Sequence, residues 1–348
     1  MTDVQAPVLA EVRNRIGHLT LNRPAGLNAL TLEMVRLLQG QLDDWANDQQ
    51  IKAVVLRGAG ERAFCAGGDI RTLYEQHLAG DAAAIETFFA EEYALDLGIH
   101  NYPKPFIALM DGFVLGGGMG LAQGASLRII TERSRLGMPE TGIGYFPDVG
   151  GSYFLPRLPG AMGNYMGITG VHIKAGDALQ AGLADMFIDS SQLAELDQLL
   201  DRINPEQDLN AQLSQLSSDS PPPAELTELL PAIELHFSQS NIASIRQSLL
   251  DEIRPAFTGW AQSTTKIMDS RSPLAMAVTL ELLRRGKEKS LEDCFAMELH
   301  LDRQWFNDGD IAEGVRALLV DKDKQPRWNP LSIGELNPAR VRAFFEGL

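Results

Sequence analysis

The sequence has few of the residues that build metal sites or disulfide frameworks. Its 348 residues include two cysteines, Cys65 and Cys294, and these do not form a C-x-x-C pair. Two separate thiols cannot form a cysteine zinc site or a set of disulfides. The six histidines are scattered without the spacing of metal ligands. We therefore predict no metal site and a reducing compartment.

Long apolar runs are also missing. No window approaches the ~18 uninterrupted apolar residues that a membrane-spanning helix needs. Residues 1–16 include Asp3, Glu11, Arg13 and Arg15, and no apolar stretch there is long enough for an export signal. The sequence thus predicts a protein that works in the cytoplasm and has no membrane partner.

The sequence has fewer basic than acidic residues. Lys and Arg number 30 and Asp and Glu number 46, which gives a formal net charge of −16. So acidic a chain is a poor candidate for general nucleic-acid binding, because that binding depends on neutralising phosphates with Lys and Arg. The hydrophobic share of 45% and the charged share of 22% are those of a globular protein and exclude global disorder.

Strand and helix patterns alternate over roughly the first 190 residues. Short apolar runs at 53–56, 106–110 and 127–130 are typical of buried strands, and residues 8–22 favour two strands around a turn. Thr31 is a good helix N-cap, because its hydroxyl can accept from the free N–H groups of a first turn. The alternation predicts an α/β core.

The character of the sequence changes after residue 190. Residues 191–255 are acidic and rich in Gln and Ser, with prolines at 221–223, and predict an acidic helical insertion or linker. Residues 256–348 predict a helical C-terminal region, in which Ser272 and Ser290 begin helices. We thus divide the sequence into a core over 1–190, the insertion over 191–255 and the helical region over 256–348.

Nucleotide-binding motifs are weak or absent. Residues 58–63 match the loose dinucleotide pattern, but loop-forming residues follow where a helix should open. No G-x-x-x-x-G-K-[ST] motif is present, so a P-loop is excluded. We interpret residues 58–63 as a tight turn.

Two glycine-rich segments could bring backbone N–H groups to a ligand. Residues 63–70 read Ala-Phe-Cys-Ala-Gly-Gly-Asp-Ile, and residues 111–120 read Asp-Gly-Phe-Val-Leu-Gly-Gly-Gly-Met-Gly. Two N–H donors aimed at one oxygen would form an oxyanion hole, which stabilises a carbonyl oxygen as it gains negative charge. The alternative is that the triple glycine only permits close packing of a helix on a strand.

A third segment, residues 138–151, carries two carboxyl groups in an apolar setting. Glu140 and Asp148 lie eight residues apart, flanked by apolar, glycine and proline residues rather than by other charges. A carboxyl group in an apolar pocket can have a raised pKa and act as a base or nucleophile. The alternative is that both are ordinary surface acids of a very acidic chain.

Together these segments resemble the crotonase (enoyl-CoA hydratase/isomerase) superfamily, and within it the 3-hydroxyisobutyryl-CoA hydrolase branch. The similarity runs from residues 21–31 through the glycine-rich segments to residues 154–157, and continues more weakly into the helical C-terminus. The string Met-Pro-Glu-Thr…Phe-Pro-Asp-Val-Gly-Gly is typical of the hydrolase branch. The resemblance implies an α/β fold, namely a crotonase-like spiral of ββα units with a helical C-terminal region.

The resemblance also implies the site. An acyl-CoA thioester carbonyl would be held by the N–H groups of Gly68 and Gly117. Glu140 matches the acid–base glutamate of the superfamily, and Asp148 matches an additional aspartate of the hydrolase branch.

Further substrate contacts follow from the same resemblance. Glu92 matches a substrate-contacting glutamate, although the residue pattern alone also allows a helix-surface acid. The adenine part is expected near the backbone of Ala66 and Ile70, and the phosphates near Arg23 and Arg71.

The activity implied by the resemblance is hydrolysis of a short branched 3-hydroxyacyl-CoA, 3-hydroxyisobutyryl-CoA, of the kind met in valine breakdown. Glu140 either attacks the carbonyl and gives a mixed anhydride, or activates a water molecule. No cofactor is expected, because CoA is part of the substrate and the reaction needs only proton and acyl transfer.

Two other functions remain open at this point. One is an enoyl-CoA hydratase or isomerase on the same fold; hydratases of the family carry a second glutamate where this sequence has Gly120, which argues against it. The other is a non-catalytic CoA-binding or assembly module, and the intact set of site residues argues against that. The resemblance also suggests a homo-oligomer joined through the C-terminal helices, a contact that residues 191–255 could obstruct.

Overall fold

The computed structural model describes residues 6–218 and 220–348. Contacts divide the chain into two compact units whose segments interleave along the sequence. Unit 1 comprises Met1–Asp69, Glu91–Leu136 and Ile173–Glu225, and unit 2 comprises Ile70–Ala90, Gly137–His172 and Leu226–Leu348. The division of the sequence at residues 190 and 255 follows chain order and stays a prediction.

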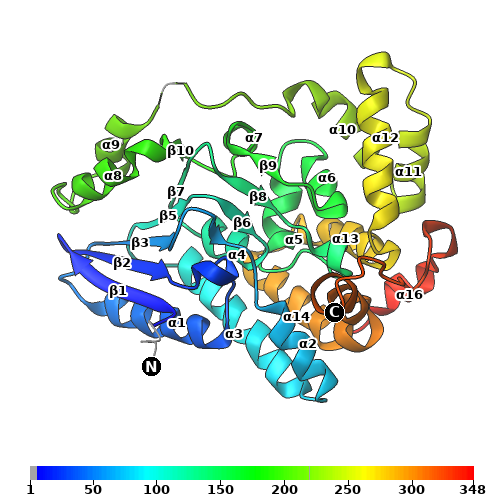
Figure 1. Ribbon diagram of the computed structural model, residues 1–348, viewed down its shortest axis with the longest axis horizontal. Helices are drawn as coiled ribbons and strands as arrows, with labels where there is room; N and C mark the ends of the chain where they lie inside the picture. The colour runs from blue at the N-terminus through cyan, green and yellow to red at the C-terminus, as the bar shows by residue number, and fades with distance from the viewer. Residues whose placement is uncertain (1–5, 219) are drawn as a thin grey trace. The chain divides into compact units, whose positions relative to one another are not determined.

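A six-stranded sheet is the framework of unit 1 (Figure 1), with the strand order β1-β2-β3-β5-β7-β10. The strands are β1 Val8–Arg13, β2 Ile16–Leu21, β3 Ala53–Gly58, β5 Phe106–Met110, β7 Leu127–Ile130 and β10 Met186–Phe187. β1 and β2 are antiparallel, and the other neighbouring pairs are parallel. Parallel strands are buried on both faces, which explains their nearly continuous apolar sequences.

Helices from distant parts of the sequence cover this sheet. α8 (Leu193–Leu200) and α9 (Leu209–Leu213) pack their leucines against apolar side chains of the sheet. The first part of segment 191–255 therefore contributes to the core of unit 1. α1 (Leu32–Asn47) begins at the predicted cap, where the Thr31 hydroxyl accepts a 3.2 Å hydrogen bond from the Met34 N–H.

A second sheet positions the glycine-rich segments. Its order is β4-β6-β8-β9, with β4 Ala63–Cys65, β6 Phe113–Leu115, β8 Arg135–Gly137 and β9 Ile173–Lys174. β4 and β6 pair in parallel. Because each of these two strands leads directly into a glycine-rich segment, the pairing brings the segments together. The sequence did not predict this sheet, since strands of two or three residues show no periodicity.

Three further helices have residues in unit 1. α4 (Gly117–Gln123) follows the triple glycine, α7 (Ala175–Ala181) follows β9, and α3 (Ala82–His100) has its last ten residues in unit 1 and its earlier ones in unit 2.

Unit 2 is built of helices around its own apolar core. Its further helices are α2 Ile70–Leu78, α5 Gly151–Phe154, α6 Met162–Thr169, α10 Leu230–Phe237, α11 Ile242–Leu250, α12 Pro255–Ser270, α13 Pro273–Gly286, α14 Leu291–Asp308, α15 Ile311–Val315 and α16 Pro338–Ala343. The core joins α6, α10, α11, α12 and α13 around Tyr165 and Phe237. Ser272 and Ser290 cap α13 and α14 as predicted.

The architecture confirms the predicted class, an α/β fold with a helical C-terminal region. Within the described part of the chain, every helix is too short or too polar to span a bilayer.

Candidate active site

Gly68 and Gly117 are neighbours in unit 1. A Cβ atom built on Gly117 would lie 3.5 Å from the backbone nitrogen of Gly68. Gly68 pairs with Leu30 in a parallel bridge, so its own N–H points away from Leu30. Gly117 is the first residue of α4, where N–H groups have no partner within the helix. Two such donors side by side are what an oxyanion hole requires, and their role in binding stays a prediction.

Glu92 is buried against Gly117. Its side chain comes from α3, its residue is 2% exposed, and its Oε1 lies 2.5 Å from the point where a Cβ atom on Gly117 would sit. Glu92 is therefore not a helix-surface acid. Only glycine fits at position 117 without moving this carboxyl group.

A second buried acid, Asp96, lies one turn after Glu92 on α3. Burial, followed by the charges of Glu92 and Asp96, raises the pKa of the Cys65 thiol to about 12. Cys65 therefore remains a thiol at neutral pH and is unsuited to act as a nucleophile. Asp96 was not among the site residues predicted from the sequence.

The two predicted phosphate-binding arginines already make contacts. Arg23 donates to the Ala29 carbonyl oxygen (2.6 Å) and to Oδ2 of Asp69 (3.1 Å). Arg71 is exposed and donates to the Leu319 carbonyl oxygen (2.9 Å). Each guanidinium has five N–H donors, so these contacts leave others for a phosphate. Their part in CoA binding stays a prediction.

Ala66 and Ile70 flank the glycine turn on its two sides. The Ala66 N–H donates to the Leu27 carbonyl oxygen (3.1 Å), and Ile70 begins α2. Both residues are half-buried. The adenine site near these two residues stays a prediction.

Glu140 is a buried carboxyl group at the start of a short 3₁₀ helix, Glu140–Ile143, in unit 2. Burial raises its pKa well above the ordinary value, and the charge of Asp148 raises it further. Its Oε2 has no hydrogen-bond partner among residues 6–218 and 220–348. A buried carboxyl oxygen that is basic and unengaged suits a general base or a nucleophile.

Asp148 is also buried, at 5% exposure, and it opens a tight turn. The Gly151 N–H donates to the Asp148 carbonyl oxygen (2.7 Å), while Val149 has φ 49° and Gly150 has φ 84°. A positive φ suits glycine but strains a β-branched residue such as valine. Such strain concentrates at functional sites. Neither Asp148 nor Glu140 is the surface acid of the alternative interpretation.

Glu298 of α14 holds the end of this turn. The Gly150 N–H donates to its Oε2 (2.8 Å) and the Ser152 N–H to its Oε1 (2.9 Å). Glu298 has no exposed surface. Glu298 was not predicted from the sequence, although an acidic residue four positions after Cys294 on an apolar helix face is a signal that could have indicated it.

Two more residues of α14 contact the same loop. The Trp305 indole N–H donates to the Gly144 carbonyl oxygen (2.9 Å), and the Tyr145 hydroxyl donates to Asp302. Glu298, Asp302 and Trp305 recur at helical spacing and so lie on one face of α14. α14 thus contacts the loop that carries Glu140 and Asp148 at three points.

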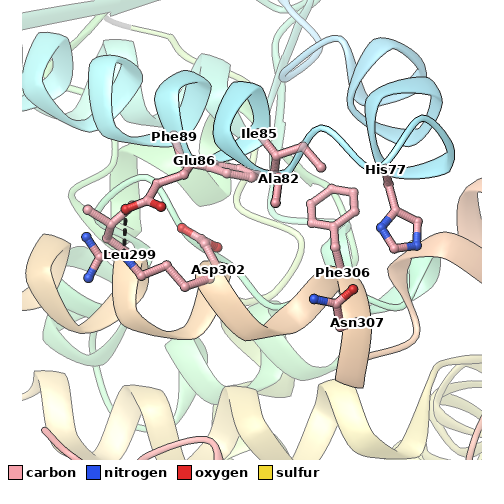
Figure 2. A pocket seen from close by; sticks show the side chains of 11 residues that line it. His77, Ala82, Ile85, Glu86, Phe89, Leu299, Asp302, Phe306 and Asn307 are labelled. Atoms are coloured by element: carbon pink, nitrogen blue, oxygen red, sulfur yellow. Dashed lines mark hydrogen bonds and ion pairs between the residues drawn. The ribbon is translucent and has the colours of Figure 1, made fainter.

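Unit 2 also contains a cavity of about 180 Å³ beside α14 (Figure 2). The rings of Phe89 and Phe306 and the carboxyl group of Asp302 line it, and Arg303 donates to Oε1 of Glu86 at 2.8 Å. None of the predicted site residues lines this cavity. Over the described residues, no cluster of three or more His, Cys, Asp or Glu side chains could hold a metal ion.

Comparison with known protein families shows to which family the chain belongs. The enoyl-CoA hydratase/isomerase family model matches residues 16–345. The chain belongs to this family. The crotonase superfamily predicted from the glycine-rich segments is thereby confirmed.

Relatives of known name are similar along almost their whole length. The chain is 38% identical over 353 residues to "3-hydroxyisobutyryl-CoA hydrolase, mitochondrial" of Gallus gallus, which covers 100% of this chain and 90% of that protein. It is 37% identical over 352 residues to the protein of the same name from Homo sapiens, with the same coverage. These similarities place the chain in the hydrolase branch.

Two solved structures share the fold over nearly the full chain. A carnitinyl-CoA dehydratase from Mycobacterium thermoresistibile is 36% identical with a TM-score of 0.91, covering 99% of this chain and 97% of that one. An enoyl-CoA hydratase from Rhodobacter sphaeroides 2.4.1 is 36% identical with a TM-score of 0.90, covering 99% and 98%. Both matches include the helical C-terminal region.

Proposed function

We propose that this protein hydrolyses 3-hydroxyisobutyryl-CoA to the free acid and CoA. The observation that carries the proposal is the buried loop with two acids, Glu140 and Asp148, in a chain similar over its full length to hydrolases of that name. The reaction fits a place in valine breakdown.

In this mechanism the N–H groups of Gly68 and Gly117 bind the thioester carbonyl oxygen. They stabilise the charge that develops on it as the tetrahedral intermediate forms. The intermediate collapses when the C–S bond breaks, and the CoA sulfur leaves as a thiolate that takes up a proton.

Glu140 starts the reaction by one of two routes. As a base, it takes a proton from a water molecule whose oxygen bonds to the carbonyl carbon, and then returns the proton to the sulfur. As a nucleophile, its own oxygen forms an anhydride with the acyl group, which water then hydrolyses. The raised pKa of Glu140 makes its ionised form strongly basic and suits both routes.

A single turnover in water enriched in the heavy oxygen isotope separates the routes. The base route places heavy oxygen in the product acid from the first turnover. In the nucleophile route, water that attacks the Glu140 carbonyl carbon of the anhydride leaves the heavy isotope in the enzyme and gives a product whose new oxygen comes from Glu140. Heavy oxygen in the Glu140 carboxyl group after one turnover therefore identifies the nucleophile route.

Asp148 and Glu92 have positioning roles in this mechanism. Asp148 accepts a hydrogen bond from the acyl hydroxyl or orients the attacking group, and Glu92 contacts the substrate beside the N–H of Gly117. A site with a buried hydrogen-bonding partner strongly rejects analogues that lack the matching group.

Release of free CoA from a panel of esters tests the function. The rate on 3-hydroxyisobutyryl-CoA should exceed the rates on acetyl-CoA and on a long-chain acyl-CoA. Equal rates on the three esters would argue against a dedicated pocket. Any specific turnover removes the proposal of a non-catalytic CoA-binding module.

A hydratase or isomerase is the second candidate, because the two solved relatives are described as a dehydratase and a hydratase. Gly120 lies buried within α4 and offers no carboxyl group to orient a water molecule. Hydration of crotonyl-CoA at a rate comparable to thioester hydrolysis would favour this candidate.

The remaining proposals concern partners and place. We propose that acyl-CoA is the partner, that no nucleic acid or membrane takes part, and that the reaction needs no metal or redox cofactor, so EDTA treatment should leave the rate unchanged. A cytoplasmic location stays a proposal, because the relatives are named as mitochondrial. Self-association is tested by sedimentation.

A further inference from the structure

The turn that carries Asp148 is closed by one carboxyl group from a distant element. Glu298 accepts hydrogen bonds from the N–H groups of Gly150 (2.8 Å) and Ser152 (2.9 Å) and from the Ser152 hydroxyl (2.5 Å). Its relative exposure is 0%. Burying a carboxyl group is unfavourable unless hydrogen bonds satisfy it, and here both oxygens are used on a single turn.

The turn needs such support because its backbone is strained. Val149 and Gly150 have consecutive positive φ values, 49° and 84°. A β-branched residue in this region is unfavourable and persists only where the surroundings hold it in place. The bonds to Glu298 begin at Gly150, directly after the strained valine, so they are placed to hold it.

Glu298 and Asp148 also interact electrostatically. Burial raises the pKa of Glu298 to about 8, and the charge of Asp148 contributes to the rise. Asp148 has the same effect on Glu140. Cys294, one turn earlier on α14, also feels the charge of Glu298. Asp148 is thus within electrostatic reach of both Glu140 and Glu298.

We propose that Glu298 is a positioning residue for the reaction. By holding Gly150 and Ser152 it fixes the strained turn, and so sets the direction in which Asp148 presents its carboxylate. This inference rests on the proposed function. A purely structural Glu298 would affect folding stability but would have no specific link to Asp148.

A double-mutant cycle on the full chain tests the link. We expect Glu298→Ala to lower kcat on 3-hydroxyisobutyryl-CoA about 10²-fold, the scale of a catalytic group misplaced by about 1 Å, with little change in KM. Glu298→Gln keeps an acceptor for the Gly150 N–H, so its kcat should fall less than that of Glu298→Ala. The variant with both Glu298→Ala and Asp148→Asn should be no slower than Asp148→Asn alone, because Glu298 affects the rate only by positioning Asp148.

Substrate preference gives a second readout. The ratio of rates on 3-hydroxyisobutyryl-CoA and isobutyryl-CoA in Glu298→Ala should change in the same direction as in Asp148→Asn. A loss of stability alone would slow both esters equally.

Glu252→Gln is the matched control. It removes another buried carboxyl group of unit 2, which accepts a 2.8 Å hydrogen bond from the Arg254 N–H. We expect a less stable protein with an unchanged kcat.

Several outcomes overturn the inference. Additive effects of the Glu298 and Asp148 changes would do so, as would wild-type kcat in both Glu298 variants. If Glu298→Ala does not fold, Glu298→Gln completes the same cycle. An inactive wild type overturns the proposed function and this inference together, whereas an active wild type with unaffected Glu298 variants overturns this inference alone.

Discussion

Oε1 of Glu92 lies 2.5 Å from the position that a Cβ atom on Gly117 would occupy. The carboxyl group reaches this point from α3, and Gly117 is the first residue of α4. Any side chain at position 117 must therefore displace Glu92. Every substitution of Gly117 therefore moves the Glu92 carboxyl group. A substitution by proline also removes the backbone N–H group of residue 117.

Comparing Gly117→Ala with Gly117→Pro separates these two effects. Both add a Cβ atom, but only proline removes the N–H, and proline is well tolerated at the first position of a helix. If this N–H stabilises the oxyanion, Gly117→Pro should lose a further ~10²–10³ in kcat relative to Gly117→Ala. Steady-state kinetics on variants with native circular dichroism measure the difference.

Gly40→Ala is the control for this pair. Gly40 lies within α1, and no atom outside its helix backbone and chain neighbours lies within 4 Å of a Cβ built there. Its replacement should leave turnover unchanged. Equal activity of the two Gly117 variants would show that the N–H is not an oxyanion donor.

Glu140→Gln should abolish most of the activity. Glutamine keeps the size of the side chain but cannot act as base or nucleophile, so kcat should fall by ~10²–10⁴ with little change in KM. Initial rates over a range of substrate concentrations measure both constants. Near-normal kcat in this variant would remove Glu140 from the chemical step.

The pH profile of the wild type should show the raised pKa of Glu140. The ionised carboxylate is the active form in both routes, so kcat should rise with pH through the raised pKa and be lost on acidification. Asp148→Asn removes one of the two causes of the rise, so the acidic limb should move to lower pH. An acidic limb that stays in place in Asp148→Asn is incompatible with this coupling.

Asp148→Asn should also reveal what Asp148 binds. If Asp148 accepts a hydrogen bond from the acyl hydroxyl, the loss should be greater on 3-hydroxyisobutyryl-CoA than on isobutyryl-CoA, because only the former has that hydroxyl. Relative kcat/KM on the two esters is the measurement. Equal slowing would assign Asp148 to the chemical step instead.

Trp305→Phe should destabilise the protein. It leaves the buried Gly144 carbonyl without the indole donor at 2.9 Å, which should cost about 1–3 kcal/mol in the free energy of unfolding. Trp260→Phe is the comparison, because its N–H contact with the Tyr165 hydroxyl is longer (3.4 Å) and only part-buried. Urea unfolding that shows the larger loss for Trp260→Phe would contradict this ranking.

The sequence predicted well what depends on neighbouring residues. The strands at 106–110 and 127–130 have the predicted bounds, because a short apolar run between turn residues defines a buried strand locally. Thr31, Ser272 and Ser290 cap helices as expected, since a cap bonds within its own first turn.

What the sequence could not show depends on distant contacts. Nothing local in residues 193–216 indicates that their leucines pack against strands as far back in the sequence as β2 and β3. The partners of Glu298 and Asp302, two residues of α14, lie in a loop far away in the sequence. Glu92 likewise lies against Gly117, which follows it by 25 residues in the sequence.

The contacts between α14 and the loop of residues 138–151 matter for attempts to transfer an activity from one member of this family to another. Residues 138–151 take their shape from Glu298, Asp302 and Trp305 as well as from their own sequence. If this loop alone were grafted into another scaffold, Glu140 and Asp148 would be present, but the contacts that fix the positions of their side chains would be missing. A unit that keeps this geometry must include at least the loop and the face of α14 that contacts it.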